Sequence, residues 1–172
     1  MPIVPETKSW TWVLERPCPE CGFDASGVPY ADIPRLAREN IERWPSVLER
    51  TDVRERPNEH TWSPLEYAAH VRDVFRIFRL RLQRMLDEDD PTFENWDQDA
   101  TAVAERYGEQ DPVAVARELV AAGAEVADDF EAVPESALDR TGRRSDGAVF
   151  TVVTLARYFI HDPVHHLWDV RG

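Results

Sequence analysis

The sequence predicts an all-α protein: a four-helix bundle with an irregular N-terminal arm. Three observations predict this fold. Apolar residues recur at helical spacing over four segments, and strand-like alternation is confined to a few residues near the N-terminus. The length of 172 residues and the hydrophobic fraction of 42% are those of one domain with a single core. We therefore expect residues 1–31 to form the arm and residues 32–172 to form the bundle.

The first two predicted helices begin with recognisable N-terminal signals. The first spans residues 32–48, with Pro34 near its start, and Pro45 interrupts its last turn. The second begins at Ser63-Pro64-Leu65-Glu66, which is a capping box with proline at the first helical position. It continues with helical periodicity until the acidic run at 87–90.

A long acidic connection separates the second helix from the third. It covers residues 87–111, and we expect a short helix within it at 100–107. Connections of this length often act as lids over functional sites. The third helix is predicted to start at an Asp111 N-cap and to end near residue 132, and the fourth to span 151–170 after a turn region rich in glycine and proline.

The N-terminal arm carries two tryptophans and a pair of cysteines. Alternation from Trp10 to Leu14 predicts a short strand. Because two tryptophans left in water would be costly, we expect the arm to pack on the bundle.

Charge and hydropathy exclude several classes of partner. The net charge of −13 would repel a phosphate backbone, so nucleic-acid binding is not expected. No stretch approaches the roughly 20 apolar residues of a membrane span, and the N-terminus lacks the apolar segment of a secretory signal. We expect a cytoplasmic protein that binds a small molecule and no membrane, with a homodimer as one option for its assembly.

Three histidines are the candidate ligands of a metal ion. His161 and His165 are four residues apart, so on a continuous helix both rings reach the same side. The alternative is an ordinary surface or core pair. His70 lies on a mixed polar and apolar stripe with Glu66 and Asp73. It is either a third ligand, with Glu66 or Asp73 orienting a ring or contacting bound water, or a core histidine satisfied by Asp73 or a backbone carbonyl.

Two segments resemble a known family. Trp62–His70, with the sequence W-S-P-L-E-Y-A-A-H, resembles the W-S-x-x-E-x-x-x-H opening of the second helix in the DinB superfamily. His161–His166 resembles the two-histidine motif of that family's final helix. Its members, which include YfiT-like proteins and the mycothiol-dependent maleylpyruvate isomerase, are four-helix bundles. The resemblance implies that His70, His161 and His165 bind one divalent metal ion, with zinc or nickel as the leading choices, and that His166 is structural or lies behind the ligands.

The resemblance also implies an activity. It points to a thiol-dependent transferase or isomerase, with a low-molecular-weight thiol such as mycothiol as co-substrate. The alternative is a non-catalytic, metal-stabilised bundle that serves as a stress-response or binding protein. Two features depart from the family pattern: the N-terminal arm, and Pro163 between the late histidines. We expect Pro163 to kink the last helix, whereas a break there would separate His161 from His165.

The cysteine pair has the form of a zinc knuckle. In Cys18-Pro19-Glu20-Cys21-Gly22 the two thiols are spaced to chelate one ion. A closed structural site needs four ligands, and His60, His166 or an acidic side chain would have to complete it. A redox or disulfide pair and an unmetallated packed turn are the alternatives.

Overall fold

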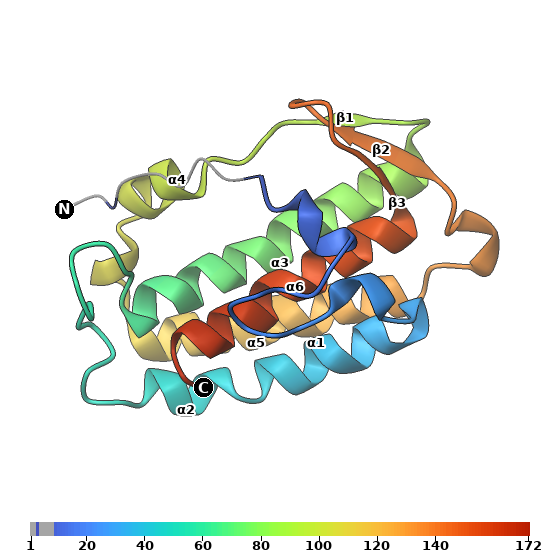
Figure 1. The fold of residues 1–172 in the computed structure, drawn as a ribbon. Coiled ribbons are helices and arrows are strands. Elements are labelled where there is room, and N and C mark those ends of the chain that lie inside the picture. The colour runs from blue at the N-terminus through green and yellow to red at the C-terminus, as the bar shows by residue number, and fades with distance from the viewer. Residues whose placement is uncertain (1–2, 4–8) are drawn as a thin grey trace.

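The four long helices of the protein pack side by side (Figure 1). The structure is a computed structural model that describes residues 3 and 9–172. The four helices are α1 (Ile33–Ile41), α3 (Pro64–Asp87), α5 (Pro112–Glu131) and α6 (Val152–Asp169). α5 and α6 each pack against both α1 and α3, so the helices close a ring around one core. The predicted helical bundle is confirmed.

Close packing between three of these helices depends on Gly123 of α5. A Cβ atom at this position would lie 2.2 Å from Cγ2 of Ile41 and 2.9 Å from Cε2 of Phe75. Only a residue without a side chain allows α1 and α3 to approach α5 this closely. The core around it is aromatic, with Phe75, Phe130 and Phe159 fully buried.

The helix starts follow the capping signals in the sequence. The Ser63 hydroxyl accepts a hydrogen bond from the backbone N–H of Glu66 at 3.3 Å, and the Glu66 carboxylate accepts one from the N–H of Ser63 at 2.8 Å. The predicted single helix over 32–48 is wrong. It is divided into α1 and α2 (Trp44–Leu48), because Pro45 has no N–H to donate to the preceding turn.

The last helix runs through its proline without a break. Pro163 lies inside α6, and a buried asparagine of α1 supports the helix there. The side-chain amide of Asn40 donates to the carbonyl of Pro163 at 2.8 Å, and its oxygen accepts from the indole N–H of Trp44 at 2.9 Å. The rings of His161 and His165 therefore stay on one side of the helix, with their centroids 5.2 Å apart.

A small sheet, which the sequence did not predict, closes one end of the bundle (Figure 1). Its order is β1 (Thr92–Phe93), β2 (Thr141–Arg144) and β3 (Val149–Thr151). β1 pairs in parallel with β2, and β2 pairs with β3 as an antiparallel hairpin. The strands are too short to show an alternating pattern. The long connection also contains α4 (Gln98–Ala104) and a 3-10 turn at Tyr107–Glu109, so its helix starts and ends earlier than predicted.

The N-terminal segment lies across α6. It forms 3-10 helices at Thr11–Leu14, Ala25–Gly27 and Tyr30–Asp32, and each of them contacts α6. The predicted strand at Trp10–Leu14 is wrong. None of the described residues forms a strand beside it, and the 3-10 turn satisfies its own backbone, with the N–H of Val13 donating to the carbonyl of Trp10 at 3.1 Å. Within residues 3 and 9–172, none of the helices has the length and apolar character needed to cross a bilayer.

Candidate metal centre

A cavity of about 810 Å³ opens beside α6. Three tryptophans from distant segments line it, Trp10, Trp62 and Trp96. One side of the cavity is strongly polar because five histidine and aspartate side chains of α6 line it. They are His161, Asp162, His165, His166 and Asp169. The cavity thus combines apolar walls with a dense group of ligand-type side chains, which is typical of small-molecule sites.

One group of these side chains, which we call the inner cluster, consists of His70, Asp162 and His166. One ligand atom from each lies within 4.8 Å of the others. Oδ1 of Asp162 is 3.4 Å from Nε2 of His70 and 3.5 Å from Nε2 of His166. α3 supplies His70, and α6 supplies the other two residues from positions four apart.

The inner cluster has the unsatisfied atoms of a site that fits a cation. His70 is fully buried, and neither of its ring nitrogens has a hydrogen-bond partner within the described part of the chain. Oδ1 of Asp162 is also buried and has no hydrogen-bond partner there, although it lies within ion-pair distance of His70 and His166. Leaving such an atom without a partner costs about 1–3 kcal/mol. A divalent ion between the three residues would bind both Nε2 of His70 and Oδ1 of Asp162, so the donor set fits a metal.

Hydrogen bonding and charge prepare the cluster for that role. Nδ1 of His166 lies 2.7 Å from Oδ2 of Asp169, and because a carboxylate only accepts, the ring donates there. Its Nε2 atom is then left facing Asp162, in the arrangement by which carboxylates orient metal-binding imidazoles. Burial would raise the pKa of Asp162, but the charges of His166 and His70, when these rings are protonated, outweigh it and hold that pKa below its usual range; a bound cation would replace those ring protons and favour the carboxylate in the same way. Asp162 is therefore ionised at neutral pH.

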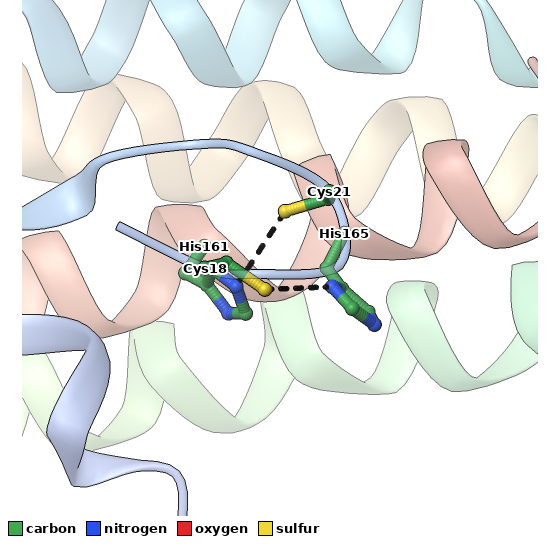
Figure 2. A group of neighbouring side chains, drawn as sticks. All are labelled: Cys18, Cys21, His161 and His165. Atoms are coloured by element: carbon green, nitrogen blue, oxygen red, sulfur yellow. Dashed lines mark hydrogen bonds between the residues drawn. The ribbon is translucent and has the colours of Figure 1, made fainter. Parts of the chain in front are cut away.

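The outer cluster is formed by Cys18, Cys21, His161 and His165 (Figure 2). Its four ligand atoms also lie within 4.8 Å of one another. Burial, reinforced by the charge of His165, lowers the pKa of His161 to about 4, and burial lowers the pKa of His165 as well. Both rings are consequently neutral at pH 7. Burial raises the pKa of Cys21 to about 11, so its thiol is protonated unless a cation lies next to it.

The structure groups the predicted ligands differently from the sequence analysis. His161 and His165 face the two cysteines, while His70 faces Asp162 and His166. His70, His161 and His165 are not brought together as one group of ligands within the described residues. The reason is the helical rotation of about 100° per residue, which puts positions 161/165 and 162/166 on neighbouring stripes of α6. Asp162 was missed, although it and His166 have the same four-residue spacing that singled out His161 and His165.

Neither carboxylate that was expected to support the ligands forms a hydrogen bond with His70 among the described residues. Glu66 pairs with Arg56 and caps α3; burial opposes its ionisation, but the hydrogen bonds from Arg56 and Ser63 outweigh this and lower its pKa. Asp73 binds Arg72 at 2.9 Å and accepts a hydrogen bond from the hydroxyl of Tyr107 at 2.5 Å. The carboxylate that orients a ring of the inner cluster is Asp169.

A buried guanidinium lines the same cavity. Arg81 is 6% exposed, lies 5.2 Å from the ring centroid of Phe78 and 5.0 Å from that of Phe93, and donates to the carbonyl of Glu94 at 3.1 Å. Among the residues whose positions are described, no carboxylate forms an ion pair with it. Burial, and secondly the charge of Arg144, lowers its pKa to about 10, so it is still charged at neutral pH. It can bind an anionic group inside the cavity.

These features define a helical-bundle protein with a candidate metal centre, and comparison with known proteins identifies its family. The model of the DinB superfamily matches residues 35–170, so the chain belongs to the DinB superfamily. Among solved structures it is similar to YfiT from Bacillus subtilis, which is described as "a probable metal-dependent hydrolase with an unusual four-helix bundle topology". The TM-score is 0.69 at 13% sequence identity, with 86% of this chain and 85% of that chain covered, and this likeness shows the fold. No curated protein matches.

Proposed function

We propose that this protein is a metal-dependent enzyme that acts on a small molecule, with the ion held by His70, Asp162 and His166. One observation carries the proposal. Three ligand atoms from two helices converge beside a cavity of about 810 Å³, and two of them are buried without hydrogen-bond partners among the described residues. Membership of the DinB superfamily and the printed description of YfiT support it.

The residues around the inner cluster would have different roles in such an enzyme. A divalent ion held by two imidazoles and a carboxylate keeps open positions, at which it polarises an oxygen or lowers the pKa of water. Asp169 fixes the His166 ring through its Nδ1 proton. Trp96 stacks on His70 with a centroid separation of 5.2 Å and an interplanar angle of 3°, which shields the ring from solvent. Arg81 binds a carboxylate or phosphate of the substrate.

Hydrolysis is the reaction that we favour. Two histidines with one carboxylate are the protein ligands of a well-known group of hydrolytic zinc sites, and YfiT is described as a probable hydrolase of this kind. Zinc or nickel is the proposed metal, since imidazole and carboxylate suit both.

A thiol-dependent transferase or isomerase is the second candidate. The observation in its favour is the cavity volume of about 810 Å³, which lies in the upper part of the usual range of about 300–1,000 Å³ for ligand sites. A cavity of this size would leave room for a low-molecular-weight thiol, for which mycothiol is the proposed example, beside an electrophilic substrate.

Asp162→Asn tests the proposal because it retains the size of the side chain and removes its charge. We expect the purified variant to lose one bound ion and its turnover of anionic ester, amide and phosphoester substrates, assayed with and without added thiol. Asp52→Asn is the matched control, since Asp52 is exposed and its carboxylate forms no hydrogen bond or ion pair within the described part of the chain. An Asp162→Asn protein with unchanged metal content and turnover would refute the proposal. Metal-loaded wild-type protein without turnover on any substrate would favour the non-catalytic bundle.

The expected partners follow from the same proposal. We propose a small-molecule substrate and expect neither nucleic acid nor a membrane as a partner. A homodimer is the alternative to a monomer. Light scattering during size-exclusion chromatography measures the mass in solution against the 19.8 kDa of one chain.

A further inference from the structure

We propose that Cys18, Cys21, His161 and His165 form a second metal site, a closed structural zinc site that fastens the N-terminal segment to α6. This inference is independent of the enzyme proposed above, since it rests on the outer cluster alone. The first two ligands belong to the turn after the first 3-10 helix, and the other two lie on successive turns of α6 (Figure 2).

Two sulfur–nitrogen distances within the outer cluster are close to those of a tetrahedral zinc site. Sγ of Cys18 is 3.6 Å from Nδ1 of His165, and Sγ of Cys21 is 3.8 Å from Nε2 of His161. Zinc binds sulfur at about 2.3 Å and imidazole nitrogen at about 2.0–2.1 Å, so tetrahedral angles place the two donors about 3.6 Å apart. These two thiol–imidazole pairs therefore lie close to the separation that a zinc ion requires, and the other pairs of ligand atoms lie within 4.8 Å of one another.

The cysteine turn is preorganised for chelation. The N–H of Cys18 donates to the carbonyl of Phe23 at 2.9 Å, and the N–H of Gly22 donates to the carbonyl of Cys18 at 2.9 Å. Gly22 has a φ of +75°, which a residue with a side chain rarely adopts, so its place after Cys21 fits this turn. Both cysteines are free thiols and both face α6 rather than forming a disulfide.

Neighbouring carboxylates determine which ring nitrogen of His165 is available to bind the ion. Its Nε2 atom lies 3.4 Å from Oε2 of Glu20 and 3.7 Å from Oδ2 of Asp169. These acceptors favour the proton on Nε2, which leaves the lone pair of Nδ1 directed at Cys18 and the ion. Carboxylates on the outer side of a ligating imidazole are a common feature of zinc sites.

Burial indicates a structural rather than a catalytic role for this ion. Cys18, His161 and His165 are all buried, and the Trp10 ring covers both histidines at centroid distances of 5.7 and 5.3 Å. Four protein ligands also complete the coordination of zinc and leave no position for a substrate.

The site would organise the neighbouring cavity as well. Glu20, between the two cysteines, and Trp10 both line the cavity, so holding the turn against α6 fixes one of its walls. His161 and His165 also directly precede Asp162 and His166 in the chain. An ion bound to them holds the helix on both sides of Pro163, where one backbone hydrogen bond is missing.

Metal analysis of two complementary variants tests the inference. The Cys18→Ser/Cys21→Ser variant removes half of the outer ligands, and Asp162→Asn removes one inner ligand. We expect the full-length Asp162→Asn protein, purified under reducing conditions with zinc, to retain one ion with two sulfur and two nitrogen neighbours in X-ray absorption. The double serine variant should lose this sulfur-bound ion. Replacement by cobalt should give a thiolate-to-cobalt charge-transfer band in wild type and Asp162→Asn but not in the serine variant.

The two proposals fail in different ways. Wild-type protein without sulfur-bound metal and without the cobalt–thiolate band would overturn the structural site, whether or not the serine variant folds. A disulfide between the cysteines in freshly purified, zinc-supplemented protein would overturn it too. Either result leaves the inner cluster untouched, since the effect of Asp162→Asn on turnover is measured separately.

Discussion

Loss of the outer ion should destabilise the protein strongly, because the ion joins distant parts of the chain. Cys21 and His161 are 140 residues apart. If the site acts as a cross-link on the unfolded chain, the entropy of closing a loop of this length corresponds to about 5 kcal/mol. For a domain of this size, 1 kcal/mol shifts the midpoint of thermal unfolding by about 2–4 °C, so removal of the ion should lower it by about 10–20 °C.

The effect of the ion must be separated from that of the substitution itself. Cys18 is 1% exposed, and a hydroxyl placed there costs about 1–3 kcal/mol without any metal. We therefore use a thermodynamic cycle in the Asp162→Asn background, in which the inner ion is expected to be lost. Urea unfolding is followed by circular dichroism for this protein and for its Cys18→Ser/Cys21→Ser derivative, each with zinc and with a chelator.

The cycle isolates the cross-link as the difference between the two responses to chelation. The protein with both cysteines should lose several kcal/mol of unfolding free energy when zinc is removed, and the derivative should lose almost none. Equal responses to the chelator in the two proteins would refute the reasoning, because the cysteines would then contribute nothing to metal-linked stability.

Three further predictions concern the core, the cavity and the start of α3. Gly123→Ala should gain about 1 kcal/mol in helix propensity but lose about 3 kcal/mol to overpacking, because its Cβ atom would lie 2.2 Å from Cγ2 of Ile41. Its urea midpoint should therefore fall, and an unchanged or higher midpoint would contradict the packing argument. Arg81→Gln should raise KM for anionic substrates by about 10- to 100-fold, because one charged hydrogen bond to the substrate is lost. KM for a neutral analogue should stay the same. Equal effects on both substrates would show that Arg81 does not bind the anionic group. Glu66→Gln should destabilise the fold by about 1–3 kcal/mol at pH 7. Because the pKa of Glu66 is lowered on folding, this stabilisation is present above the pKa of Glu66 in the unfolded chain and disappears as pH falls through its pKa in the folded protein. The stabilities of wild type and variant, measured by urea unfolding, should therefore converge in acid. A difference that does not change with pH would contradict the role given to the Glu66 carboxylate.

Local signals in the sequence were sufficient to predict the bundle. The Ser63–Glu66 capping box and the Asp111 N-cap are determined by neighbours in the chain, and both helices begin where these signals place them. The sheet could not be predicted in this way. β1 has two residues and pairs with a strand about 50 residues later, so its existence depends on tertiary contacts rather than on any periodic pattern.

The sequence predicted that α6 carries the candidate metal ligands, but it did not predict which side chains come together in one cluster. Four-residue spacing identifies side chains that share a face of α6, and this chain has two such pairs one residue out of phase, 161/165 and 162/166. Spacing alone does not show which pair faces α3. The choice depends on the rotation of α6 about its axis, which follows from burial of its apolar residues and from the seating of the N-terminal segment.

Because the two pairs are offset by one residue, α6 contributes to two different clusters from adjacent stripes of its surface. His161 and His165 face a pair of soft thiols, whereas Asp162 and His166 face a single imidazole, and all four residues line the same cavity. Sulfur-rich, four-ligand surroundings suit a permanent structural ion, and a mixed nitrogen and oxygen set with open positions suits reactive chemistry. Since each residue of one pair is bonded to its neighbour in the other, an ion in the outer cluster restrains the backbone that carries the inner one. X-ray absorption and a metal titration of the Cys18→Ser/Cys21→Ser protein measure the geometry and the affinity of the inner metal, and a change in either would demonstrate this coupling. An inner site unchanged in that protein would show that the two stripes act independently.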